Sequence, residues 1–100
     1  LFCYIMMFDN DKYITRGVQK EIDPRLQLML WRAIQDMKGE KDYLQVFELN
    51  AEKGCQLVRH RQEVPLYEKT FVVKGTNPYT GKIFVIDDGD HSTMMLAEEY

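Results

Sequence analysis

The sequence predicts a single α+β domain in which one long amphipathic helix, at residues 24–38, packs on a curled, mostly antiparallel sheet of five to six strands. Apolar residues recur at helical spacing in that segment, and the chain after it alternates with period two between turn residues. A length of 100 residues leaves room for one hydrophobic core. We therefore expect residues 1–100 to form one roll-like domain.

The first eight residues are the most apolar stretch of the chain. They are too short to span a bilayer, and they lack the basic segment that opens a signal peptide. Met6 and Met7 suggest a natural start, which would make residues 1–6 foreign or upstream sequence. The alternative is a genuine apolar strand, and the pattern leaves both open.

Residues 13–18 are rich in β-branched and aromatic side chains and predict a short strand. The helix follows it. Asp23 is a good N-cap, and Pro24 suits the first helical position, where no N–H is needed. Lys38 and Gly39 suit the C-terminal end. The apolar positions of the helix face are Leu26, Met29, Leu30, Ala33, Ile34 and Met37.

The chain after the helix predicts five strands joined by short turns. A four-residue loop that ends in Gly54 separates the first two, which should therefore form a hairpin. Pro65 cannot donate to a sheet ladder and predicts a bend or an edge. The predicted strands are residues 43–50, 55–62, 66–74, 82–87 and 93–99.

The dimensions of these elements predict the curl of the sheet. A helix over residues 24–38 is about 22 Å long and about 10 Å wide, whereas five strands make a sheet roughly 20–25 Å across. One helix cannot cover a flat sheet of that width, so the sheet should curl around it. Residues 83–86 form a continuous apolar run, as in a strand buried on both faces. A homodimer is the simplest cover for the second face.

Charge and cysteine content exclude several function classes. The formal net charge is −3, which argues against nucleic-acid binding because such proteins carry a basic face. Cys3 and Cys55 are the only cysteines, and they give neither a metal-ligand spacing nor a disulfide framework, which indicates the reducing cytoplasm. No catalytic, cofactor-binding or metal-binding arrangement is recognisable, and this favours a protein that is not an enzyme.

Two polar clusters are candidates for chemistry. Residues 87–92 hold three carboxylates, an imidazole and a hydroxyl, but they match no calcium loop and suit a tight turn. Arg59 and Arg61 share one face of a predicted strand and are a candidate anion contact, although a solvated or carboxylate-paired face is the commoner arrangement. His60 points to the other face and has no identifiable nucleophile to serve.

The helix side opposite the apolar stripe carries Leu28, Trp31 and Gln35, which form a candidate interaction surface. Tryptophan is enriched at the energetic centres of protein interfaces. The alternative is that the apolar N-terminal segment, or a strand edge, covers Trp31 within the same chain.

Several segments together are similar to one known family. They are YITRGVQ (13–19), LQL (26–28) with LW (30–31), DYLQVF (42–47), HRQEVP (60–65), KIFVIDDG (82–89) and LAEEY (96–100). These segments resemble the staphylococcal protein of unknown function family (domain of unknown function nine-sixty) of low-GC Gram-positive bacteria and their phages. The resemblance covers about residues 7–100 and implies a single-domain α+β roll that begins near Met7, ends at Tyr100 and has no assigned activity.

We therefore expect a small cytoplasmic bacterial protein that acts as a non-enzymatic interaction or binding module, as a homodimer or with a protein partner, and without a membrane span. The alternative is a ligand-binding or small enzymatic roll. In that case a pocket between helix and sheet should receive His60 or an arginine.

Overall fold

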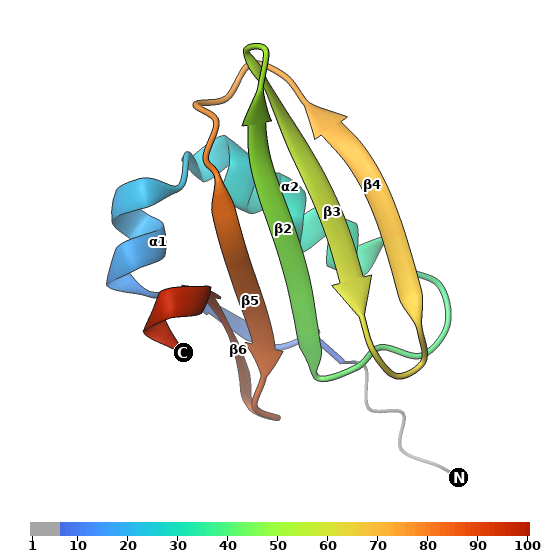
Figure 1. The fold of residues 1–100 in the computed structure, drawn as a ribbon. Helices are drawn as coiled ribbons and strands as arrows, with labels where there is room; N and C mark the ends of the chain where they lie inside the picture. Colours follow the sequence, from blue (N-terminus) through green and yellow to red (C-terminus); the bar gives the residue numbers. More distant parts are fainter. Residues whose placement is uncertain (1–6) are drawn as a thin grey trace, which may run out of the picture.

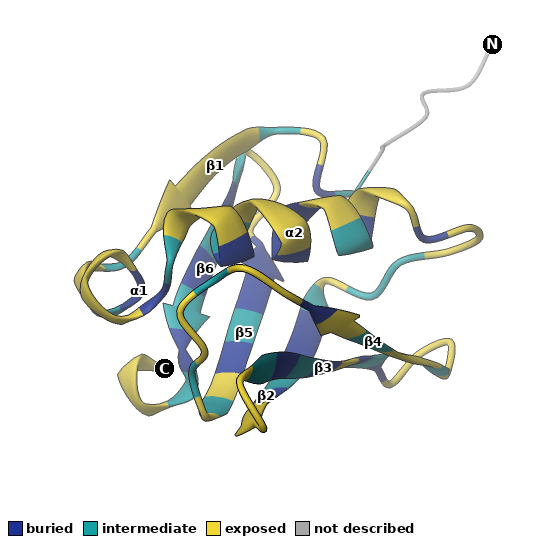
Figure 2. Cartoon of the chain, turned by 90° about the horizontal axis from the view of Figure 1, so that it is seen from above, coloured by how far each residue is buried: buried dark blue, intermediate teal, exposed yellow. Residues whose placement is uncertain are grey.

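Six strands form one sheet, and helix α2 lies across one of its faces, as Figure 1 and Figure 2 show. The computed structural model describes residues 7–100, so the alternatives for residues 1–6 lie outside the described residues. The elements are β1 (Asp11–Ile14), α1 (Arg16–Glu21), α2 (Pro24–Gln35), β2 (Leu44–Glu52), β3 (Cys55–Gln62), β4 (Tyr67–Val73), β5 (Gly81–Asp87), β6 (His91–Leu96) and the 3-10 turn η1 (Ala97–Glu99).

The sheet is mostly antiparallel, with strand order β1-β6-β5-β2-β3-β4. β2 lies at its centre, where Phe47 pairs with His60 of β3 and with Ile83 of β5. The exception is the edge strand β1, which runs parallel to β6. Parallel neighbours need a long connection, and here the whole chain from α1 to β5 provides it. The α+β class and the predicted hairpin of β2 and β3 are confirmed.

Helix α2 begins where the sequence predicts and ends earlier. The Asp23 carboxylate accepts a hydrogen bond from the Arg25 N–H at 2.9 Å, which caps the first turn. The helix ends at Gln35, so the expected long helix to residue 38 is wrong. A 3-10-type hydrogen bond, from the Met37 N–H to the Ile34 carbonyl three residues earlier (3.2 Å), closes the last turn.

The buried face of α2 is rotated about the helix axis relative to the face that the apolar spacing predicts. Leu26, Leu30 and Ile34 are fully buried as expected. Met29, expected in the core, is 39% exposed, whereas Trp31 is only 9% exposed and belongs to the core. The core stripe therefore runs on the Trp31 side of the helix.

A second helix, α1, replaces part of a predicted strand. The strand expected at residues 13–18 ends at Ile14, and residues 16–21 are helical. The Thr15 hydroxyl accepts a hydrogen bond from the Val18 N–H at 3.3 Å and donates to the Glu99 carboxylate at 2.6 Å. This cap satisfies the helix N-terminus and outweighs the local β preference.

The sheet is open, and the expected curl into a roll is not supported. Helix α1 and the segment before β1 cover the area that α2 leaves free. Phe8, Val18 and Ile22 are buried in the same core as the side chains of α2. One helix does not cover the whole sheet, and these additional elements cover the rest of it without curvature. Within residues 7–100, no helix has the length and apolar character needed to cross a bilayer.

The continuous apolar run of β5 does face both sides of the sheet. Ile83 and Val85 are fully buried in the core, under the helices. Phe84 points to the other side and is half-buried, with its ring edge-to-face to Tyr100 at 5.5 Å. The C-terminal residue of the chain therefore shields part of the second face.

Gly17 allows the contact between α1 and η1, and this generates a stability prediction. A Cβ at this position would lie 2.6 Å from the Glu99 carboxyl carbon. Gly17→Ala should destabilise the domain by about 1–2 kcal/mol, because Glu99 must leave the hydrogen bonds that it accepts from the Thr15 hydroxyl and the Gly17 N–H. Urea unfolding of both proteins measures the difference.

The matched control is the same change in a Glu99→Ala background. There Gly17→Ala should stabilise by about 0.5–1 kcal/mol through helix propensity alone. The same sign in both backgrounds would contradict the role given to Glu99.

Candidate functional site

Three polar side chains joined to one another by hydrogen bonds are buried on the inward face of β2 and β3. Gln45, His60 and Gln62 are each at most 2% exposed. A buried polar side chain without a partner costs free energy, so its hydrogen bonds must be accounted for one by one. Their arrangement defines the candidate site.

Backbone groups fix the orientation of both glutamine amides. Gln62 Nε2 donates to the carbonyls of Glu40 (3.1 Å) and Pro65 (2.8 Å), which can only accept. Gln62 Oε1 accepts from the Asp42 N–H (2.8 Å), which can only donate, and from Gln45 Nε2 (2.7 Å). Gln45 must therefore turn its Oε1 toward His60.

This orientation selects one tautomer of His60. Its Nε2 lies 2.7 Å from Gln45 Oε1, which can only accept, so Nε2 carries the proton and donates. The other ring nitrogen, Nδ1, then presents a lone pair. Although Nδ1 is buried, it has no hydrogen-bond partner among the described residues. His60 is thus a pre-oriented hydrogen-bond acceptor.

Aromatic contacts and burial keep the ring rigid and neutral. The His60 ring stacks on Phe47 at 4.4 Å and meets the edge of Tyr67 at 5.2 Å. Burial lowers the pKa of His60 to about 4, with a further contribution from the nearby Lys69 ammonium. Near neutral pH the ring is uncharged, and it is too weakly basic to accept a proton readily.

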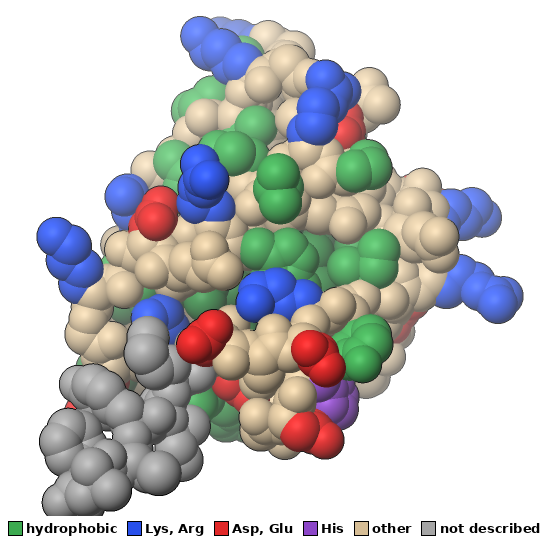
Figure 3. All heavy atoms as spheres, turned by 180° about the vertical axis from the view of Figure 1, so that it is seen from behind, with side chains coloured by type: hydrophobic (Ala, Val, Ile, Leu, Met, Phe, Trp, Pro, Cys, Tyr) green, Lys and Arg blue, Asp and Glu red, His purple; other side chains and the backbone are tan. Residues whose placement is uncertain are grey.

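His60 lines a pocket of about 190 Å³ between α2 and the strands β3 and β4, which we call the His60 pocket. Arg32, Asp36 and Lys69 surround it, and none of the three forms an ion pair with another described residue. On the helix side of the molecule, Figure 3 shows Lys and Arg side chains around central hydrophobic ones. The lining residues are Met29, Arg32, Ala33, Asp36, His60, Tyr67, Lys69 and Phe71.

The predicted interaction surface does not form as one patch. Leu28 is 68% exposed and Gln35 is also exposed, but Trp31 is buried. The edge strand β1 covers it, with the Lys12 ammonium 5.8 Å from the centre of the Trp31 ring. Figure 2 shows β1 running beside α2. Trp31 therefore belongs to the buried side of α2 and not to an exposed surface.

The candidate anion contact is occupied by carboxylates of the same chain. Arg59 makes two hydrogen bonds to Glu68, at 2.9 and 3.1 Å, and one to Glu48 at 3.1 Å. Arg61 also pairs with Glu48 at 3.1 Å. The bonds to Arg59 lower the pKa of Glu68. Both guanidinium groups therefore pair with carboxylates of the same chain, as in the commoner arrangement of such a strand face.

Residues 87–92 form the predicted turn between β5 and β6. The Asp88 N–H donates to the His91 carbonyl at 2.8 Å, which closes it. The Asp87 carboxylate accepts from the N–H groups of Phe8 and Gly89, both at 2.7 Å, and so ties the turn to the segment before β1. Among residues 7–100, no three potential metal ligands are grouped to hold an ion.

The buried glutamines were missed in the sequence, although a signal for them exists. In the predicted hairpin, Gln45 shares a strand face with Phe47 and Leu49 by period two. Polar residues at inward positions of a strand indicate a buried network. The same period places Gln62 on the face of His60.

The protonation state of His60 predicts a dependence of stability on pH. The unfolded chain takes up the proton near the ordinary pKa of 6.5, and the folded chain only near pH 4. The stabilisation of the folded state by neutral His60 is therefore complete above pH 6.5 and is lost as the pH falls to 4. The wild type should lose about 3 kcal/mol more than His60→Gln over this interval. Denaturant unfolding of both proteins across this range measures it, and parallel curves would contradict the buried neutral state.

Comparisons with known proteins agree with this fold. One solved structure, "Crystal structure of the protein of unknown function from Enterococcus faecalis", matches with a TM-score of 0.87 and 25% sequence identity, over 97% of this chain and 98% of that chain. No curated protein matches. The model of the family "Staphylococcal protein of unknown function (DUF960)" matches residues 11–99. The chain therefore belongs to this family, as the resemblance in its sequence indicated.

Proposed function

We propose that this domain binds a small-molecule ligand in the His60 pocket. The observation that carries the proposal is the free lone pair of His60 Nδ1. A buried polar atom left unpaired costs about 1–3 kcal/mol, and a ligand that donates a hydrogen bond would remove that cost. Native proteins leave few such atoms unpaired, and those that persist often have a functional reason.

The chemistry of the pocket favours binding over catalysis. With its pKa lowered to about 4, His60 is a poor general base near neutral pH. A neutral, rigid acceptor between apolar walls suits recognition of a ligand that stays unchanged.

A fragment titration followed by NMR tests this function. Small polar fragments should shift the backbone amide signals of Ala33, His60 and Phe71. Ala33→Leu should abolish these shifts, because the larger side chain fills the space beside α2. The control is Gln19→Leu, the addition of a leucine at an exposed position of α1. Shifts confined to other regions, or shifts that survive Ala33→Leu, would contradict the proposal.

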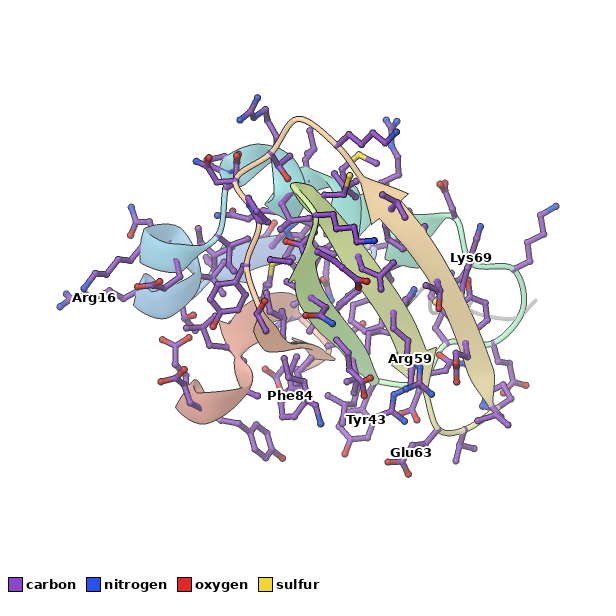
Figure 4. All side chains as sticks on the ribbon, turned by 45° about the horizontal axis from the view of Figure 1, so that its top comes forward. Arg16, Tyr43, Arg59, Glu63, Lys69 and Phe84 are labelled. Carbon is purple, nitrogen blue, oxygen red and sulfur yellow. The ribbon has the colours of Figure 1, made fainter. Side chains whose placement is uncertain are left out.

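We propose as a second candidate that the protein self-associates through the sheet face turned away from α2, which we call the open face. Tyr43, Arg59 and Phe84 lie on this face in Figure 4. Tyr43 is 57% exposed and Tyr100, which packs on Phe84, is 79% exposed. The two positive charges of Arg59 and Arg61 are matched by the two negative charges of Glu48 and Glu68, so this cluster adds no net charge to the face. In this candidate, the non-enzymatic interaction role is self-association.

Light scattering after size exclusion tests self-association. The wild type should elute with the mass of a dimer, and Tyr43→Glu should elute as a monomer, because it places a carboxylate in the centre of the contact. Leu28→Glu is the matched change on the opposite side of the molecule and should leave the dimer intact. A monomeric wild type would contradict this candidate, and dissociation by Leu28→Glu alone would move the contact to the helix.

For either role we propose a cytoplasmic location. Cys55 is a free cysteine and half-buried. A reducing compartment keeps such a thiol unmodified.

A further inference from the structure

We propose that the ligand of the His60 pocket is a small planar carboxylate with an N–H or O–H donor next to its carboxylate group. This inference rests on the proposed ligand-binding function and specifies the ligand. Four properties of the pocket support it: its volume, its charges, the spacing of its polar groups and its walls.

The volume limits the ligand to a small molecule. A space of about 190 Å³ lies below the usual range of ligand pockets, about 300–1,000 Å³. A single five- or six-membered ring with one substituent is of this order. Nucleotides, peptides and acyl chains are too large to be enclosed there.

The charges favour one negative charge on the ligand. Arg32 and Lys69 contribute two positive charges at the rim, and Asp36 contributes one negative charge. None of these groups is neutralised by an ion pair with another described residue. The surplus of one positive charge attracts a monoanion, while Asp36 disfavours a second negative charge.

The register of β3 and β4 fixes the spacing of the two polar contacts. His60 pairs directly with Lys69 across the two strands. Side chains at directly opposite positions start about 4.5–5.5 Å apart. The two side chains therefore leave the same face of the sheet at adjacent positions, and both line the pocket. This arrangement suits a ligand that carries its donor and its negative charge on neighbouring atoms.

The walls favour a flat apolar body. Met29 and Ala33 of α2 lie on one side of the pocket, and Tyr67 and Phe71 of β4 lie on the other. A conjugated ring between a thioether and aromatic side chains gains dispersion contacts with each. A bulky or strongly hydrated body would lose them.

Pyrrole-2-carboxylate is a probe with these properties, and two analogues isolate its parts. Furan-2-carboxylate has the same shape and charge but places an oxygen acceptor where the donor was. Pyrrole-2-carboxamide keeps the donor and loses the charge. The dissociation constant of each is measured with the full chain by titration of the backbone amide signals of Ala33, His60 and Phe71.

Pyrrole-2-carboxylate should bind at least about tenfold more tightly than either analogue, since one hydrogen bond to a buried group is worth about this factor. Lys69→Gln should remove the preference over the carboxamide and keep the preference over the furan. The control Lys82→Gln, at an exposed position of β5, should change neither ratio.

Equal binding of the three probes, or tighter binding of the furan, would overturn this ligand class while leaving the pocket a binding site. Absence of any shift from all three probes up to their solubility limit would also overturn the ligand class. The broader fragment titration would then decide separately whether the pocket binds ligands at all.

Discussion

A chain of hydrogen bonds fixes the orientation of His60. It runs from the backbone of residues 40–42 and Pro65 through the side chains of Gln62 and Gln45 to the imidazole. Each link has one possible direction, because the chain starts at carbonyls and an N–H that cannot exchange roles. The direction passes through two amides and ends on the imidazole. It also joins the loop after α2 to β2 and β3, and it leaves Nδ1 of His60 unpaired.

Two carboxylates join segments that are far apart in the sequence. Asp87 accepts from the N–H of Phe8, 79 residues earlier, and Glu99 accepts from the hydroxyl of Thr15, 84 residues earlier. These contacts place the segment before β1 and helix α1 over the part of the sheet that α2 does not reach. An open sheet is thereby covered without curling, and its helix side is closed except along β4.

How much could be predicted from the sequence depends on whether the cause was local. Asp23 and Pro24 predict the start of α2, and period-two alternation predicts the strands, because each signal lies within a few residues. Helix α1 was missed although its cap, Thr15, is local, because the surrounding residues favour a strand and Glu99 from the far end of the chain adds further hydrogen bonds to this helix start. Trp31 was misplaced because the helical spacing does not reveal that β1 joins β6 and covers it. The free nitrogen of His60 could not be predicted, since it follows from contacts among four separate segments.

His60 is held as a neutral ring with its proton on Nε2 and a free lone pair on Nδ1. Long-range ¹H–¹⁵N NMR spectra of the histidine rings measure this most directly at neutral pH. We expect a protonated, pyrrole-like signal for Nε2 and an unprotonated, pyridine-like signal for Nδ1 of His60. A proton on Nδ1, or an imidazolium ring, would contradict it.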